Sequence, residues 1–231
     1  VYATEYTSAG YVFCIPDIRY EPGHPAKSAY DCIMCGTDHV LDILPNVDSN
    51  RMALQGQSWG GYQTAQLVTM TDRYAAAMAG APVANMFSAY GGIRWGSGRS
   101  RMSQYEHGQS RIGGTPWEYP VRYIENSPIF FVDKINTPVL IMHNDSDTAV
   151  PWYQGIEFFV ALRRLGKPAW FLNYNGEPHW PLKRQNRQEF NIMMAQFFDY
   201  YLKGEAMPVW MERCVPAIEK GINQGYELIN R

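Results

Sequence analysis

A serine flanked by glycines lies between two regular segments of the sequence and limits the folds that the chain can adopt. Residues 56–61 read Gly-Gln-Ser-Trp-Gly-Gly, which matches G-x-S-x-G with its serine at Ser58. The pattern of residues 51–55 is typical of a short buried strand, and that of residues 62–70 is typical of a helix. Glycines permit a sharp turn that a Cβ would obstruct. This order of strand, turn and helix predicts a nucleophile elbow, which presents the serine hydroxyl above the edge of a sheet.

An ordinary strand-to-helix turn, with Ser58 as the helix N-cap, is the alternative interpretation. Chance alone produces G-x-S-x-G in about one chain in ten of this length. A catalytic serine also needs an acid and a histidine, and in this type of fold they follow in the order Ser, Asp, His. The rest of the sequence therefore decides between the two interpretations.

Short apolar runs alternate with helical segments along the chain. We expect strands at 10–17, 51–55, 74–80, 138–142 and 169–174, and helices at 29–44, 59–71, 152–165 and 187–202, with Gly204 as a stop signal. The apolar run at 10–17 is continuous enough to be covered on both faces. This alternation predicts an α/β fold with a mostly parallel sheet and helices on both faces.

The organisation predicted is a single domain over residues 1–231. Within it, residues 82–128 are rich in glycine, arginine and aromatic residues, and we expect a helical or loop insertion there. The tail from residue 205 to 231 is loosely patterned. In parallel sheets the chemistry lies where strands end, so candidate residues should directly follow strands.

Composition excludes several classes of function. The chain has 231 residues, of which 46% are hydrophobic and 18% charged, so it can bury a sizeable core. Its formal net charge of −2 does not suggest a nucleic-acid surface. No apolar run reaches the ~18 residues of a membrane span, and no signal peptide is visible at Val1. The compartment stays open between the cytoplasm and the periplasm or secretion.

Cys32 and Cys35 form a C-x-x-C sequence. A redox motif or half of a zinc site is one interpretation. No second C-x-x-C or histidine pair supports zinc, so we favour two thiols on the buried face of a helix. We expect no metal and no cofactor.

The acid and the histidine follow two later strands. Asp147 lies in the segment His-Asn-Asp-Ser-Asp-Thr-Ala-Val-Pro at 143–151, and His179 ends Gly-Glu-Pro-His at 176–179. Ser58, Asp147 and His179 thus occur in the expected order, each beyond the carboxyl end of an expected strand. In such a site the histidine accepts the serine proton, and the aspartate holds the imidazole tautomer.

Each of these residues has an alternative. Asp145 competes with Asp147 for the role of the acid, and either could be a helix N-cap instead. His143, Asp145 and Asp147 alternate, which could present metal ligands on one side of an extended segment. We favour a structural role for His143, packed at the strand end and bonded to the loop backbone.

These segments together resemble the catalytic domain of the prolyl oligopeptidase family, the α/β-hydrolase serine peptidases that include dipeptidyl and acylaminoacyl peptidases. The likeness runs from about residue 10 to residue 202. The matching segments are Asp-Ile-Arg-Tyr at 17–20, Gly-Gln-Ser-Trp-Gly-Gly-Tyr at 56–62, Ala-Gly-Ala-Pro-Val at 79–83, Asn-Ser-Pro at 126–128, residues 143–151, residues 159–168 and residues 176–179.

The resemblance implies roles for particular residues. It places the acid three residues before the valine of the Val-Pro pair, at Asp147, and one oxyanion-hole donor at the backbone N–H of Trp59. The pocket for the side chain before the scissile bond would be lined by Tyr62, Val83, Met86, Tyr90, Ile93 and Trp95. The family's substrate-carbonyl anchor, an Asn or Arg two residues after the acid, is replaced by Ala149. We favour the interpretation that Arg94, Arg99, Arg101 and Arg111 are solvated charges on loops. The alternative is that they bind a carboxylate of the peptide.

The resemblance also implies parts that this sequence lacks. Family members enter the hydrolase domain through earlier strands and a loop that supplies a second oxyanion donor, and only 57 residues precede Ser58. We therefore expect a fragment of a longer chain, with an N-terminal β-propeller as partner domain. The expected function is a serine peptidase acting on peptide substrates, and a homo-oligomer is compatible with it. An esterase with the same three residues and a non-catalytic hydrolase-like binding domain are the alternatives.

Overall fold

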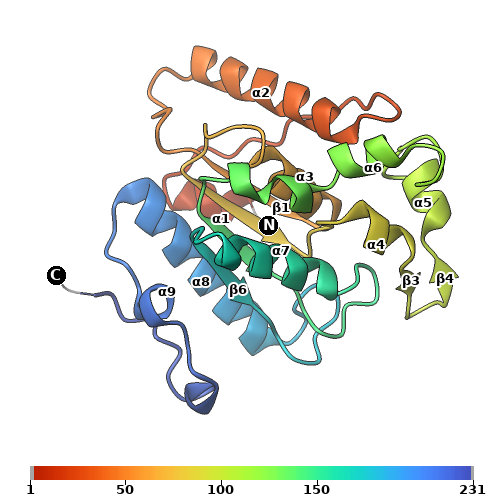
Figure 1. The fold of residues 1–231 in the computed structure, drawn as a ribbon. Helices are drawn as coiled ribbons and strands as arrows, with labels where there is room; N and C mark the ends of the chain where they lie inside the picture. The colour runs from red at the N-terminus through yellow and green to blue at the C-terminus, as the bar shows by residue number, and fades with distance from the viewer. Residues whose placement is uncertain (1–2, 230–231) are drawn as a thin grey trace.

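A four-stranded parallel sheet forms the centre of the molecule (Figure 1), in a computed structural model that describes residues 3–229. Its order is β1-β2-β5-β6. The strands are β1 (Ala53–Gln57), β2 (Ala76–Gly80), β5 (Val139–Met142) and β6 (Ala169–Leu172). Gly56 lies beside Ala79, and Met78 beside Leu140. The four strands expected from residue 51 onward are confirmed, with ends that differ by up to two residues.

Helices cover both faces of this sheet, as predicted. One face packs against α3 (Trp59–Leu67), α7 (Tyr153–Arg164) and the 3₁₀ segment η1 (Pro128–Lys134), through a cluster that contains Ala79 and Ile141. Helix α2 (Pro25–Ile43) lies outside α3. The sheet residues alternate in direction, because successive side chains of a strand point to opposite faces.

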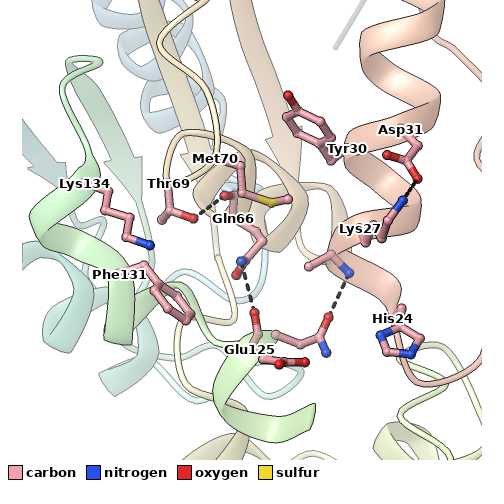
Figure 2. Close-up of a pocket in the computed structure, with 12 residues that line it drawn as sticks. His24, Lys27, Tyr30, Asp31, Gln66, Thr69, Met70, Glu125, Phe131 and Lys134 are labelled. Carbon is pink, nitrogen blue, oxygen red and sulfur yellow. Dashed lines mark hydrogen bonds and ion pairs between the residues drawn. The ribbon is translucent and has the colours of Figure 1, made fainter. Parts of the chain in front are cut away.

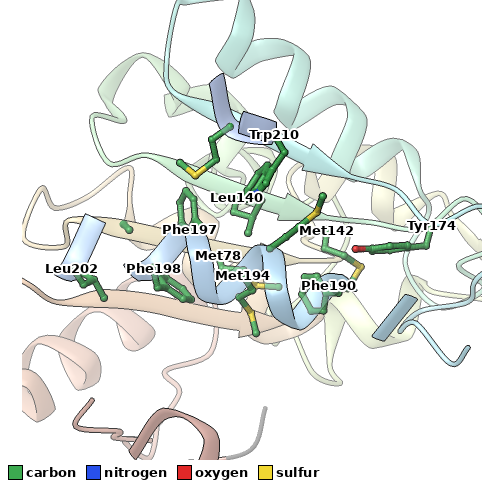
Figure 3. Packing of buried hydrophobic residues seen from close by; sticks show 13 residues of the cluster. Met78, Leu140, Met142, Tyr174, Phe190, Met194, Phe197, Phe198, Leu202 and Trp210 are labelled. Atoms are coloured by element: carbon green, nitrogen blue, oxygen red, sulfur yellow. The ribbon is translucent and has the colours of Figure 1, made fainter. Parts of the chain in front are cut away.

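The opposite face of the sheet packs against α8 (Arg184–Lys203) in an aromatic and methionine-rich core (Figure 3). Met78, Leu140 and Met142 point from the strands toward this helix. From α8 and the segment after it come the buried side chains of Phe190, Met193, Met194, Phe197, Phe198, Leu202 and Trp210. Helix α8 ends as predicted, because Gly204 adopts the left-handed conformation with φ of 73°.

The stretch between β2 and β5 contains short elements only. Besides η1, they are α4 (Met86–Tyr90), the β3–β4 hairpin (Ile93–Arg94 and Arg99–Ser100), α5 (Met102–Glu106) and α6 (Pro120–Glu125). The remaining elements are α1 (Ala3–Ser8) before the sheet, and α9 (Val209–Arg213) and η2 (Ala217–Glu219) after α8. None of the described helices is both long and apolar enough to cross a membrane.

The prediction of a buried strand at residues 10–17 is wrong. The segment has no regular structure, and Val12 and Ile15 expose 53% and 77% of their surface. Tyr11 donates a hydrogen bond to Asp199 of α8, and the ring of Phe13 stacks on Tyr6. An apolar run becomes a strand only where another strand pairs with it, and in residues 3–229 the sheet ends at β1.

The prediction that both thiols of the C-x-x-C sequence lie on a buried helix face is also wrong. Both cysteines lie on α2, but Cys35 is exposed and Cys32 is half-buried. The face of α2 that is buried lies at its first turn, around Pro25 and Ala29. Cys32 and Cys35 are free thiols without a disulfide.

Candidate active site

Ser58 stands at a sharp turn between β1 and α3. Its backbone has φ of 61° and ψ of −116°, a region that non-glycine residues rarely occupy. Its N–H donates to the carbonyl of Gly80 at 2.8 Å, which ties the turn to β2. Although Ser58 is the N-cap of α3, its side chain forms no capping hydrogen bond. The hydroxyl is therefore not used as an ordinary helix cap, and the strained turn has the geometry of an elbow.

Two glycines make this turn sterically feasible. A Cβ on Gly56 would lie 2.1 Å from the carbonyl oxygen of Gly60, and one on Gly61 would lie 2.2 Å from that of Gly80. By contrast, a Cβ on Gly60 would meet no atom within 4 Å. The glycine that α3 needs for its close approach to β2 is therefore Gly61, which lies outside the five-residue motif.

Asp147 and His179 meet beyond the carboxyl ends of β5 and β6. Nδ1 of His179 lies 2.6 Å from Oδ2 of Asp147, whose side chain is fully buried. The other oxygen, Oδ1, accepts hydrogen bonds from the N–H groups of Ala149 at 2.7 Å and Val150 at 2.9 Å. Burial alone would raise the pKa of Asp147, but hydrogen bonds from His143, His179 and Val150 hold that pKa well below its usual range. The carboxylate is thus ionised and oriented toward the histidine.

His143 contacts the same carboxylate from inside the protein. Its side chain is fully buried, and its Nε2 lies 3.2 Å from Oδ2 of Asp147 and 3.2 Å from the carbonyl oxygen of Val150. A proton on Nε2 fits both acceptors. Its Nδ1 has no hydrogen-bond partner among the described residues and packs against Gly155. The predicted bond from His143 to the loop backbone is present, and the sequence did not reveal the contact with Asp147.

The loop that carries His179 is held by three side chains from two other segments, the end of β1 and the loop after β5. Asn144 donates to the carbonyl of Pro178 at 2.8 Å, and Gln57 donates to the carbonyl of His179 at 2.8 Å. Asp145 accepts from Asn175 and from the N–H of Gly176, both at 2.7 Å. Its carboxylate therefore fixes the start of this loop, whereas the hydrogen bond to the His179 ring comes from Asp147, which stands in the position of the acid.

Glu177 holds the other end of the same loop and was not predicted from the sequence. It is 1% exposed and accepts hydrogen bonds from the N–H groups of Leu182 at 2.8 Å and Lys183 at 3.1 Å, and from the side chain of Asn186. These bonds outweigh its burial and lower the pKa of Glu177. The sequence offered no signal for this role, because the residue type alone does not show that the acid is buried among backbone donors.

Ser58 and His179 are not joined by a hydrogen bond in the described part of this structure. The His179 side chain is 29% exposed. Catalytic hydrogen bonds are often long in ligand-free enzymes and tighten when substrate binds. The N–H of Trp59 is at the first position of α3, where a helix offers it no acceptor of its own.

Tyr20, the last residue of the Asp-Ile-Arg-Tyr segment, contacts the residue that follows the elbow serine. Its hydroxyl accepts a hydrogen bond from the indole of Trp59 at 2.8 Å and another from Gln63. Arg111 lies over the Tyr20 ring, 4.8 Å from its centroid. The segment before α2 is thereby fixed to the residue that follows the elbow serine.

Four of the six predicted pocket residues meet in one buried cluster behind the elbow. Tyr62, Val83, Met86 and Tyr90 are each at most 4% exposed and pack with Tyr105, Tyr123 and Val150. Ile93 and Trp95 are not brought into this cluster, since they are 43% and 76% exposed on the β3–β4 hairpin.

Two cavities on the described part of the molecule lie away from these residues. One, of about 460 Å³, lies between the start of α2, the end of α3 and η1 (Figure 2). Gln66, Phe131 and Lys134 point into it, at the opposite end of α3 from Ser58. The second, of about 780 Å³, lies between β6, α8 and the C-terminal segment. Neither includes Ser58, Asp147 or His179 in its lining.

The metal alternative finds no support in the geometry of residues 143–147. His143 and Asp147 bond to each other, and Asp145 bonds to Asn175 and Gly176. Within residues 3–229 no group of three or more His, Cys, Asp or Glu side chains could hold a metal ion.

The sequence profile of the prolyl oligopeptidase family matches residues 3–205. Among curated relatives, dipeptidyl-peptidase 5 of Porphyromonas endodontalis is 30% identical over 167 residues, which cover 68% of this chain and 22% of that protein. The acylamino-acid-releasing enzyme of Rattus norvegicus is 30% identical over 160 residues, which cover 68% of this chain and 21% of that protein. The chain thus spans less than a quarter of the length of these two relatives.

Among solved structures, an acylaminoacyl peptidase of Pyrococcus horikoshii matches with a TM-score of 0.73 and 22% identity, over 84% of this chain and 31% of that one. The fold is therefore the α/β-hydrolase fold of these peptidases, of which this chain contains a part. The prediction of that fold class is confirmed.

Proposed function

Because the chain belongs to the prolyl oligopeptidase family, we propose that it is the catalytic part of a serine peptidase that hydrolyses short peptides through an acyl-enzyme. The names of its relatives, a dipeptidyl peptidase and an acylamino-acid-releasing enzyme, support peptide substrates. The observation that carries the proposal is the 2.6 Å contact between Nδ1 of His179 and the buried Asp147 carboxylate. It directs Nε2, the nitrogen that would accept a proton, away from the aspartate.

In this proposal Ser58 is the nucleophile, His179 the general base and Asp147 the residue that fixes the imidazole tautomer. The Ser58 hydroxyl attacks the substrate carbonyl, and Nε2 of His179 takes its proton. The Trp59 N–H donates to the oxyanion that forms. The imidazolium then protonates the leaving amine, and water releases the acyl group by the same route in reverse.

We propose that the buried cluster behind the elbow forms the floor of the pocket for the side chain before the scissile bond. The apolar residues of this floor would be Tyr62, Val83, Met86 and Tyr90. Ile93 and Trp95 would flank its entrance from the hairpin, since both are exposed there.

The proposal also covers the domain organisation of the longer protein. Residues 1–231 would form one hydrolase domain with an insertion at about 82–128, and an N-terminal β-propeller would be its partner domain. The support is that the relatives are more than four times as long as the matched segment. The second oxyanion donor and a homo-oligomeric state remain predictions.

The test is hydrolysis by the full-length protein of a panel of aminoacyl-proline and aminoacyl-alanine amides beside simple esters. The proposal expects amide turnover that Ser58→Ala removes and that Ser146→Ala, an exposed loop serine, retains. Ester turnover without amide turnover would favour the esterase alternative. No turnover of either kind would favour the non-catalytic binding domain.

A further inference from the structure

Arg101 is a buried cation without a counter-ion. It lies between β4 and α5 and is 2% exposed. Its Nε and Nη1 atoms are buried and have no hydrogen-bond partner, and no ion pair in the described part of the chain involves it. Proteins rarely bury an arginine in this way, because a desolvated charge is costly unless it is paired. The guanidinium of Arg101 therefore lacks a hydrogen-bond acceptor within the described part of the folded chain.

Polar groups on α5 and in the buried cluster that it joins share the same deficit. The guanidinium carbon of Arg101 is 5.5 Å from the centroid of the Tyr105 ring. The hydroxyl of Tyr105, that of Tyr62 in the same cluster and that of Ser110 beyond α5 are likewise buried without partners. Burial raises the pKa of both tyrosines, so their hydroxyls keep the protons that they can donate. All of these groups can donate hydrogen bonds. Glu106, the acid of α5, already accepts one from Tyr90 at 2.6 Å.

This donor-rich site lies behind the candidate catalytic residues. Tyr62 and Tyr105 belong to the same buried cluster as Val150, whose N–H bonds to Asp147. Arg101 also borders that loop, because a Cβ built on Gly92 would touch both its Cδ, at 3.7 Å, and the ring of Pro151, at 3.1 Å. The site thus adjoins the pocket proposed above for the substrate.

We infer that Arg101 anchors a subsite that binds a carboxylate of the substrate, with Tyr105 as a further donor. A carboxylate supplies several acceptor positions and the charge that a guanidinium fork matches. The inference rests on the proposed function and narrows it to substrates that carry an acidic side chain or a free C-terminus. It revises the sequence-based interpretation of Arg101 as a solvated loop charge.

The β3–β4 hairpin provides the route to this subsite. It directly precedes Arg101, and a Cβ on Gly96 at its turn would lie 3.1 Å from Oγ1 of Thr148, next to Asp147. The hairpin pairs only Ile93 with Ser100 and Arg94 with Arg99. Its displacement by an entering substrate would break few hydrogen bonds.

The first test compares two pairs of substrates on the full-length protein. One pair has Glu or Gln before the scissile bond and an amidated C-terminus, and the other has a neutral side chain and a free or amidated C-terminus. We expect a kcat/KM preference for the carboxylate of roughly 10- to 100-fold in one pair, which identifies its source. Arg101→Met removes the preference, whereas Arg99→Met, at an exposed arginine two residues away, retains it.

The second test does not depend on hydrolysis. N-acetylglutamate should raise the Tm of the parent protein and of Arg99→Met but not that of Arg101→Met. If Arg101→Met does not fold, Arg101→Lys, which keeps the charge and loses the fork, should show a reduced shift. An equal Tm shift in parent and Arg101 variants, or a carboxylate preference that survives Arg101→Met, would overturn the inference. A parent that binds N-acetylglutamate through Arg101 but hydrolyses nothing would refute the proposed function alone.

Discussion

Oδ2 of Asp147 lies 3.2 Å from Nε2 of His143, a histidine with a fully buried side chain. The same oxygen receives Nδ1 of His179 at 2.6 Å. One carboxylate oxygen thus links a histidine that is partly exposed to one that cannot reach solvent. The buried histidine fixes the carboxylate, and the carboxylate fixes the exposed histidine.

Replacing His143 should therefore lower activity without removing it. His143→Leu deletes one donor to Asp147, and we expect kcat to fall roughly tenfold, the value of a lost hydrogen bond to a charged group. His143→Gln, whose amide can still donate, should recover most of this loss. Equal losses in the two variants would show that His143 matters for packing alone, and kinetics on both with matched Tm measurements decide the question.

Asp147 and Asp145 should differ sharply although only one residue separates them. Asp147→Asn should lower kcat by roughly 10⁴-fold, because the amide favours the wrong imidazole tautomer. Asp145→Asn should cost far less, since Asp145 contacts only the loop at Asn175 and Gly176. Comparable losses would contradict the assignment of Asp147 as the acid, and a steady-state comparison of the two variants would reveal them.

Acid should destabilise the protein in part through Asp147. Its folded-state pKa lies well below the unfolded value of about 4, so at low pH the unfolded chain binds a proton that the folded chain does not. The resulting stability is fully present above pH ~4 and is lost as the pH falls toward the folded pKa. Urea unfolding of the parent between pH 5 and pH 3 should show this loss, with a smaller slope for Asp147→Asn. Identical slopes would show that Asp147 does not contribute.

Two neighbouring glycines of the elbow should respond in opposite ways to the same change. Gly61→Ala forces a Cβ to within 2.2 Å of a backbone carbonyl oxygen of β2, and we expect a loss of about 3 kcal/mol or more in the free energy of unfolding. Gly60→Ala meets no atom within 4 Å inside a helix, and we expect no loss and up to about 1 kcal/mol of gain. Denaturant unfolding of the pair tests this, and a stable Gly61→Ala would refute the close packing of α3 on β2.

The alternation of strands and helices in the sequence was enough to predict the sheet from β1 onward and the residues at its carboxyl edge. The strands from β1 onward alternate with their helices, and Asp147 and His179 meet because parallel strands end at one edge of the sheet. The apolar run at 10–17 has the pattern of a strand but no strand to pair with among residues 3–229, and pairing is not a local property. The burial of Arg101 was not predictable either, because no sequence pattern distinguishes a buried arginine from its exposed neighbour Arg99.

Labelling of the full-length protein by a fluorophosphonate probe, with the adduct mapped by peptide mass spectrometry, shows whether Ser58 is a nucleophile activated by His179. We expect an adduct on Ser58 in the parent, its loss in Ser58→Ala and a strong reduction in His179→Ala. An unlabelled Ser58 in folded full-length protein, or equal labelling in His179→Ala, would rule out this role for Ser58 and His179.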